Sequence, residues 1–291
     1  MLIDSHSHID SERYAEDREA MLRRAYDAGV GTVLAIGIGE QAAGMDGALG
    51  VCREFNGKLG LPRLYASAGV YPHNTHEIDD AILAKLDSLL AEPEVIGCGE
   101  IGLDYYHEGT PHDIQRAGLI QQLEIAAAHK RPILIHCRPK DSEVPSDRSS
   151  SLRRKDGEFD AWDDLFEILE AHWRPTGLGG IMHCFSGGWD EARHSLDLGF
   201  LLSFAGNMTF PKAQPLRDVA ARLPFDGLLV ETDAPWLAPV PNRGKRNEPA
   251  WVAHTAAVLA GLLAVDGEEI AAATTKNFQR LFNLGADVGN C

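Results

Sequence analysis

The chain has 291 residues, of which 44% are hydrophobic and 24% are charged, so it can bury a full core. Acidic residues outnumber basic ones by 43 to 27, which gives a formal net charge of −16. A surface this acidic repels nucleic-acid backbones at long range and excludes a non-specific binder with a broad basic face. It does not exclude a phosphoester substrate, because bound cations supply positive charge locally.

The five cysteines are widely spaced and form no CxxC pair, which favours a reduced, intracellular protein over a disulfide framework. The opening MLIDSHSH lacks the basic region and long apolar run of a secretory signal. No apolar stretch reaches the roughly 18 residues of a membrane-spanning helix. We therefore expect a cytoplasmic protein with no membrane partner, and the sequence leaves its oligomeric state open.

Short apolar, β-branched runs alternate with longer stretches along the chain. The runs predict eight strands, at Leu2–Ser5, Thr32–Gly37, Leu64–Gly69, Val95–Gly99, Ile133–His136, Gly180–His183, Phe200–Ser203 and Leu228–Glu231. Apolar residues at three- and four-residue spacing predict helices between strands, at Glu12–Ala28, Asp79–Ala91, His112–His129, Trp162–His172 and Asp190–Leu198. Further helices are expected after the last strand, at Trp251–Leu263, Gly267–Thr275 and Lys276–Leu284.

This alternation predicts parallel strands joined by right-handed crossovers, and eight units favour an α/β fold of the (β/α)8 TIM-barrel type. An open, doubly wound sheet is the alternative. We expect one domain over residues 1–291, because no repeat or linker divides the chain. The segment 139–160 is polar and without useful periodicity, which predicts a long loop inserted after the fifth strand.

Metal-binding residue types stand at the C-terminal ends of these strands. His6 and His8 end the first strand, and their i, i+2 spacing places both rings on one face. Four more follow or end later strands, namely Glu100, His136, His183 and Asp233. Any one of them alone is more simply read as a satisfied polar residue or a helix cap. Their coincidence at the face where a barrel builds its active site predicts a metal centre instead.

Six nitrogen and oxygen ligands are too many for one tetrahedral ion and suit two divalent cations. We expect one ion on His6, His8, Glu100 and Asp233 and the other on Glu100, His136 and His183, with Glu100 as the bridge. Asp233 is also the expected general base towards an attacking water, so Glu100 and Asp233 are the candidate catalytic residues. Histidine ligands favour Zn or Mn over Mg without excluding Mg. Cys137 and Cys184 follow two of the histidines and are expected to point away, towards the helices.

The motifs, taken in order, resemble the TatD family of metal-dependent deoxyribonucleases. The resemblance runs through DSHSHID, GVYPHN, GEIGLDYY, ILIHCR, MHCFSG, ETDAPWLAP and RNEP, and so covers the whole chain. It implies a TIM barrel that hydrolyses phosphodiester bonds, commonly from DNA ends, with the six ligands named above. It also implies that His73 contacts the scissile phosphate. Asp104 and Arg246 are further candidates that the sequence does not rank.

Arg138 lies two residues after His136, so in an extended strand it points the same way and is expected to bind a substrate phosphate. Two departures from the family pattern stand out. Tyr71 replaces the usual histidine before the proline, and the HCR motif runs into the long polar segment. One hypothesis makes that segment a lid that brings basic residues over a phosphate, namely Arg148, Arg153, Arg154 and Lys155; a solvated loop is the alternative.

These features predict a divalent-metal-dependent hydrolase, most simply a deoxyribonuclease of exonuclease type. The expected partner is DNA or another phosphodiester, short or single-stranded because of the acidic balance. Two alternatives stay open: an amidohydrolase-like enzyme acting on a lactone, amide or aminoacyl ester, and a metal-binding scaffold without turnover.

Overall fold

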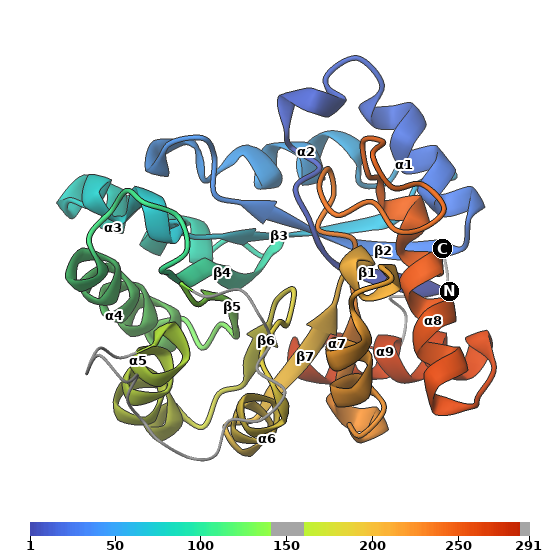
Figure 1. The fold of residues 1–291 in the computed structure, drawn as a ribbon. Helices are drawn as coiled ribbons and strands as arrows, with labels where there is room; N and C mark the ends of the chain where they lie inside the picture. Colours follow the sequence, from blue (N-terminus) through green and yellow to red (C-terminus); the bar gives the residue numbers. More distant parts are fainter. Residues whose placement is uncertain (141–159, 286–291) are drawn as a thin grey trace.

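A computed structural model describes residues 1–140 and 160–285 of the chain. Eight parallel strands follow one another around a single sheet in chain order (Figure 1). They are β1 (Leu2–Ser7), β2 (Val30–Gly37), β3 (Arg63–Ala68), β4 (Val95–Asp104), β5 (Ile133–Arg138), β6 (Gly180–Met182), β7 (Phe200–Phe204) and β8 (Leu228–Val230). The single-domain (β/α)8 barrel is confirmed. A doubly wound sheet is excluded because each strand pairs with the next one in sequence.

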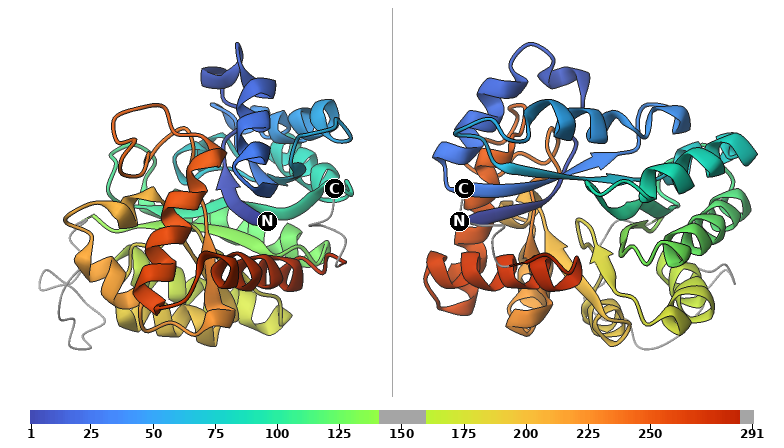
Figure 2. Two further views of the ribbon diagram at one scale, coloured as in Figure 1. Left: turned by 90° about the vertical axis from the view of Figure 1, so that its right-hand side faces the viewer. Right: turned by 180° about the vertical axis from the view of Figure 1, so that it is seen from behind.

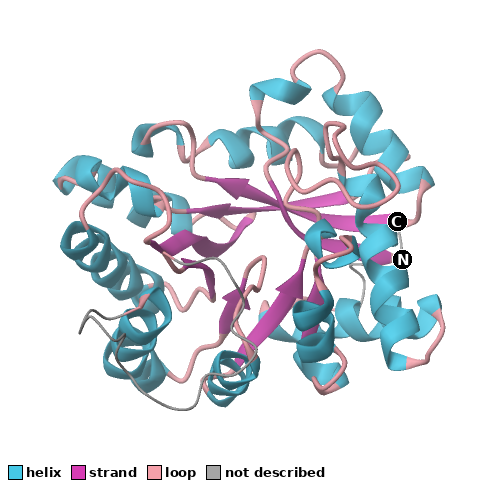
Figure 3. Cartoon of the chain, in the orientation of Figure 1, coloured by secondary structure: helices cyan, strands magenta, loops and turns pink. Residues whose placement is uncertain are grey.

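Helices form the outer layer around the strands (Figure 3). They are α1 (Arg18–Asp27), α2 (Gly47–Phe55), α3 (Asp80–Leu90), α4 (His112–Ala128), α5 (Ala161–Ile168), α6 (Trp189–Asp197), α7 (Gln214–Ala220), α8 (Val252–Leu263) and α9 (Gly267–Leu281). Short helical turns join several of them, namely η1 (Glu12–Tyr14), η2 (Ala42–Gly44), η3 (Pro72–Glu77), η4 (Leu169–Trp173), η5 (Arg174–Thr176), η6 (Gly206–Thr209), η7 (Phe225–Gly227) and η8 (Pro249–Trp251).

The helix predictions differ from the structure at five places. The sequence pattern did not predict α2, which begins at Gly47, or α7, which has only seven residues. The helix expected over Glu12–Ala28 is divided into η1 and α1, and the helix expected over Trp162–His172 is divided into α5 and η4. The two helices expected over 267–284 form the single helix α9, which begins where the Asp266 side chain accepts a hydrogen bond from the backbone N–H of Glu269 at 2.8 Å.

The barrel closes between its first and last strands through the segment that follows β8. Ser7 and Ala234 form a parallel bridge. The backbone N–H of Asp233 donates to the carbonyl of His6 at 3.0 Å, and that of His8 donates to the carbonyl of Ala234 at 2.8 Å. The hydrogen bonds that close the barrel therefore hold three of the predicted metal ligands, His6, His8 and Asp233, next to one another.

Strand β4 extends beyond its predicted end at Gly99 and runs to Asp104. Its pairing with β5 shifts register between Cys98 and Ile101, which is a bulge that contains Glu100. Gly102 has a φ of +141° there, and a Cβ at this position would lie 1.9 Å from the carbonyl oxygen of His136. Glu100 therefore lies inside a strand rather than after it, at a point where two strands approach too closely for a side chain at Gly102.

Two apolar layers hold the fold together. Buried side chains between strands and helices form the outer layer, and a smaller cluster fills the barrel interior. Helix α9 lies across the N-terminal end of the barrel (Figure 2) and contributes Phe278 and Phe282 to the inner cluster. The barrel is thus closed at one end, and the site must form at the other.

No single helix among the described residues has the length and apolar composition to cross a bilayer. Only Pro249–Leu263 and Gly267–Leu281 meet that test as a pair, and they are bent by 107°. The loop predicted at 139–160 lies outside the described residues except at Pro139, Lys140 and Asp160. The four basic residues of the lid hypothesis also lie outside them.

Candidate metal centre

The structure brings all six predicted ligands together at the C-terminal end of the barrel. His6 lies in β1 and His8 just after it, while Glu100 lies in β4 and His136 in β5. His183 follows β6 by one residue and Asp233 follows β8 by three. All are buried or nearly so, and the side chains of His136 and Asp233 are the most exposed at 16% and 15%. Parallel strands in a closed barrel end on one face, which is why residues 227 positions apart meet.

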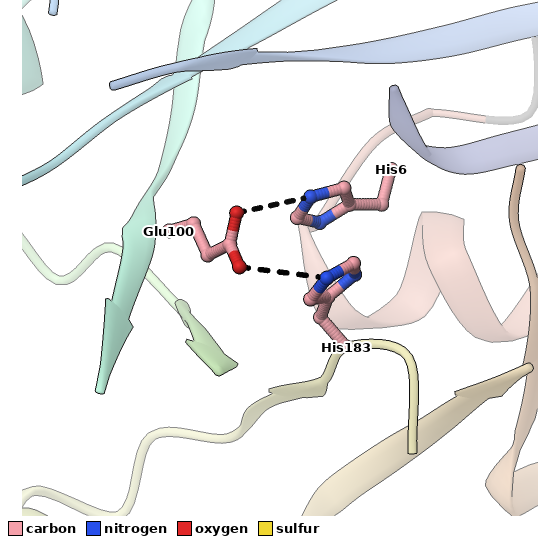
Figure 4. A group of neighbouring side chains, drawn as sticks. All are labelled: His6, Glu100 and His183. Carbon is pink, nitrogen blue, oxygen red and sulfur yellow. Dashed lines mark ion pairs between the residues drawn. The ribbon is translucent and has the colours of Figure 1, made fainter. Parts of the chain in front are cut away.

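Glu100 stands between two groups of imidazoles, His6 with His8 and His136 with His183. Figure 4 draws one ring of each group, His6 and His183, and each of them faces a different oxygen of Glu100. Its Oε2 lies 3.4 Å from Nε2 of His6 and 3.5 Å from Nε2 of His8. Its Oε1 lies 2.8 Å from Nδ1 of His136 and 3.5 Å from Nε2 of His183. One carboxylate oxygen therefore faces each group.

The first group has the spacing of ligands around a single ion. Nε2 of His6 lies 3.2 Å from Nε2 of His8 and 3.9 Å from Oδ1 of Asp233, and Nε2 of His8 lies 3.6 Å from Oδ1 of Asp233. When the distances from Glu100 Oε2 to the two histidines are included, the distances between ligand atoms in this group run from 3.2 to 3.9 Å. Ligand atoms about 2.0–2.1 Å from one tetrahedral ion lie roughly 3.4 Å apart. The donors therefore fit a divalent cation of that size.

Two carboxylates that were not predicted to belong to the site hold the ligands and their loops in position. Oε1 of Glu231 lies 2.7 Å from Nδ1 of His183 and accepts from the backbone N–H of Cys184 at 2.8 Å. Asp4 is fully buried and accepts from the backbone N–H of Thr232 at 2.9 Å and from its hydroxyl at 2.6 Å. Carboxylates in this position orient metal-binding histidines and the loops that carry them. Glu231 stands two residues before Asp233, and that spacing was the available signal.

Burial and opposite charges act against each other on the ionisable groups of the centre. Burial alone would raise the pKa of Glu100, but His183, His136 and His6 outweigh it and hold that pKa well below its usual value. The pKa of Asp233 is lowered in the same way, with burial overcome by His8 and His183. Burial opposes protonation of His183, yet Glu231 and Glu100 raise its pKa to about 10. Glu100 and Asp233 are thus ionised, and without metal the His183 ring beside them is protonated at neutral pH.

A cavity of about 620 Å³ opens onto the centre. Glu100, His136, His183 and Asp233 line it together with Arg138, whose guanidinium carbon lies 4.0 Å from the centroid of the Tyr106 ring. Trp236 also lines the cavity, with 45% of the residue exposed. Of the two predicted substrate residues, Arg138 is among the described residues that line the cavity, and His73 is not. His73 lies against Asp104, with its Nε2 3.2 Å from Oδ2.

Two further expectations need correction or completion. Cys137 packs in the outer core as expected but also lines the cavity, and Cys184 lines the cavity rather than pointing away from it. Alternation failed there because β6 ends at Met182 and Cys184 has a left-handed φ of +43°. Arg246 is a structural residue: it donates to both carboxylate oxygens of Asp17 at 2.8 Å and so ties the segment after β8 to the start of α1.

Residues 3–283 match a protein family described as TatD related DNase. The chain belongs to the TatD family. The metal-dependent hydrolase YcfH of Escherichia coli K12 is 36% identical over 288 residues, which cover 98% of this chain and 97% of that protein. The 3′-5′ ssDNA/RNA exonuclease TatD of Erwinia tasmaniensis is 30% identical over 288 residues, which cover 97% of this chain and all of that protein.

Among solved structures, YjjV, a TatD homologue from Escherichia coli, superposes with a TM-score of 0.82 at 30% identity and covers 98% of both chains. The likeness extends over the whole TatD barrel rather than over a few motifs. The protein is thus a metal-dependent hydrolase of the TatD family with a TIM-barrel fold.

Proposed function

We propose that this TatD-family hydrolase cleaves phosphodiester bonds at the ends of single-stranded nucleic acid, with a pair of divalent cations. The observation that carries the proposal is the position of Glu100: its Oε2 faces His6 and His8, and its Oε1 faces His136 and His183. A carboxylate with this surrounding is suited to bridge two ions. Zn and Mn match a ligand set rich in histidine, and Mg is the third candidate.

Bound cations in such a pair supply Lewis-acid polarisation of a phosphoryl oxygen and a water of lowered pKa. The chain itself supplies a general base and a residue that binds the phosphate. Asp233 lines the cavity beside His8, and its lowered pKa keeps it ionised, so it accepts the proton of the attacking water. Arg138 lines the same cavity and binds the phosphate through charge-assisted hydrogen bonds.

Three features support a single-stranded substrate. Trp236 presents a half-exposed ring to the cavity, and bases of a single strand stack on such rings. The net charge of −16 opposes long contacts with a duplex backbone. The Erwinia tasmaniensis relative is named as a 3′-5′ ssDNA/RNA exonuclease.

The test supplies Mg, Mn or Zn to chelator-stripped protein and follows short single strands labelled at the 3′ or the 5′ end. Matched blunt duplexes and a panel of lactones and amides serve as competing substrates. We expect release of nucleotides from one end of the single strand. Faster turnover of a lactone or an amide would contradict the proposal.

The variant Asp233→Asn tests whether the carboxylate of Asp233 takes part in catalysis. We expect kcat on the single strand to fall by about 10²- to 10⁴-fold or more, because the carboxylate is both base and ligand. Asp87→Asn, which alters a carboxylate that is paired with His129 away from the centre, is the control and should keep full activity. Wild-type kcat in Asp233→Asn would refute this role.

A further inference from the structure

A second cluster of metal-binding groups lies beside the centre. Asp104 ends β4, four residues after Glu100; His107 follows in the next loop, and His73 comes from η3. Nδ1 of His107 lies 2.8 Å and Nε2 of His73 lies 3.2 Å from Oδ2 of Asp104. The three ligand atoms all lie within 4.8 Å of one another. None of these residues belongs to the proposed pair of ions.

Oδ2 of Asp104 is crowded by more groups than a carboxylate oxygen can accept from. Its partner Oδ1 is already used by the backbone N–H groups of Tyr106 at 2.9 Å and His107 at 3.1 Å. Four groups lie around Oδ2: His107 Nδ1 at 2.8 Å, His73 Nε2 at 3.2 Å, the Tyr71 hydroxyl at 3.3 Å and His136 Nε2 at 3.6 Å. An oxygen with two free lone pairs cannot serve four donors, whereas a cation can be shared by several of these groups.

His73 supplies an independent sign. Its Nε2 is buried and, within the described part of the chain, makes no aligned hydrogen bond, although Asp104 is 3.2 Å away. Its carbonyl accepts from the Thr110 hydroxyl at 2.6 Å, which holds the residue in place. Gly109 packs against the ring so closely that a Cβ there would lie 3.2 Å from Nδ1. The imidazole is therefore fixed with an unsatisfied nitrogen directed at the cluster.

We propose that His73, Asp104 and His107 bind an additional divalent cation of the Zn or Mn type. Two imidazoles and one carboxylate are the ligand set of open zinc sites, which leave a position for water or substrate. His107 has a half-exposed side chain and lines the cavity, so the open position faces the substrate.

The additional cation would add positive charge to the cavity of an acidic protein. His136 spans the two sites, with Nδ1 2.8 Å from Glu100 and Nε2 3.6 Å from Asp104. Arg138, the proposed phosphate-binding residue, lines the same cavity as His136 and His107. The proposal concerns metal content, so it stands or falls separately from the proposed substrate.

The test measures metal content. Chelator-stripped protein is equilibrated with excess Zn or Mn, freed of unbound metal and analysed by mass spectrometry, and crystals are examined by anomalous scattering at the metal edge. We expect three equivalents per chain for the wild type and two for His107→Gln, with loss of the anomalous peak beside Asp104. His129→Gln, in a histidine paired with Asp87, is the matched control and should keep three. His107 is chosen because its half-exposed side chain makes misfolding of the variant improbable.

The outcomes separate the two proposals. Two equivalents in both the wild type and His107→Gln, lost in His8→Gln, would overturn the additional site and leave the pair intact. A single equivalent that depends on His107 but not on His8 would overturn the pair and support the additional site. An anomalous peak beside Asp104 that persists in His107→Gln would overturn the ligand assignment.

Discussion

Glu100 owes its position to the backbone around it. It lies in the bulge of β4, and Gly102, two residues on, lets β5 approach to a distance that no side chain would allow. The bulge turns the carboxylate towards both β1 and β5, so that each oxygen meets a different pair of histidines. A regular strand would present the carboxylate to one side only. The residue type was readable from sequence, but the bulge that aims it was not.

Replacing Glu231 tests whether a carboxylate behind His183 strengthens metal binding at the centre. Glu231→Gln removes the charge that lies 2.7 Å from Nδ1 of His183, while keeping the size of the side chain. We expect metal affinity to fall by about 10- to 100-fold, as is typical for the loss of a carboxylate behind a metal-binding histidine. Titration with Zn against a competing chelator measures it. The control is Glu191→Gln, which alters a cavity-lining carboxylate that accepts from the backbone N–H of Gly188 at 2.8 Å. Equal affinities in the two variants would contradict the role.

Trp236 tests the stacking role. Its ring is 45% exposed, lines the cavity and lies edge-on to His8 with 4.9 Å between ring centroids. Trp236→Leu should raise KM for a single strand by about 5- to 150-fold, because stacking is worth about 1–3 kcal/mol per base, and should change kcat little. Phe225→Leu alters another exposed aromatic residue, outside the cavity lining, and should leave KM unchanged. An unchanged KM in Trp236→Leu would refute stacking there.

At the scale of elements, α9 is the part of the chain that closes the barrel. Phe278 is fully buried in the inner cluster, and the Asn277 amide donates to the carbonyl of Leu228 at 2.9 Å. The sequence predicted helical structure here but divided it between Thr275 and Lys276. A helix that covers the end of a barrel has apolar residues dictated by the barrel beneath it, so its own periodicity marks its limits poorly.

Phe278→Ala should lower the free energy of unfolding by about 3–5 kcal/mol, because a large side chain is lost from a site that cannot collapse. Urea unfolding with metal-free protein measures the change. The exposed neighbour Lys276→Ala should change stability by about 0.5 kcal/mol or less. Metal content should be unchanged in both variants, since the centre lies at the opposite end of the barrel. A loss of metal with Phe278→Ala alone would show that the two ends are coupled.

At the scale of the whole molecule, the metal centre links parts of the chain that are far apart in sequence. Removal of metal by a chelator should therefore abolish hydrolysis and lower Tm, and returning the cation should restore both. A cation at 100 times its Kd stabilises the folded state by about 2.7 kcal/mol if it does not bind the unfolded chain. Calorimetry over a range of cation concentrations checks this. A Tm independent of cation would argue against a bound metal in the native protein.

Cation binding should also release protons. Without metal, the pKa of His183 is raised to about 10, so the ring is protonated at neutral pH, and a metal ligand must be neutral. Affinity should therefore increase as pH rises towards 10 and fall as pH is lowered. Titration calorimetry in buffers of different ionisation enthalpy counts the protons. A binding enthalpy that is the same in all buffers would contradict the prediction.

The sequence by itself determined the order of the eight strands and the six residues gathered at the centre. Both follow from local rules: side chains alternate along a strand, and parallel strands in chain order end on one face. That is why His6 and His8 could be assigned to one face before any contact was known.

Only the tertiary structure decided what surrounds these residues. The closure of β1 against the segment after β8 brings Asp4 and Thr232 together, and the left-handed backbone at Cys184 puts that residue in the cavity. Asp104 could not be ranked from sequence because its neighbours come from three separate segments of the chain. Contacts of this kind depend on how closely distant segments approach, which is set by packing of the whole barrel and not by any local pattern.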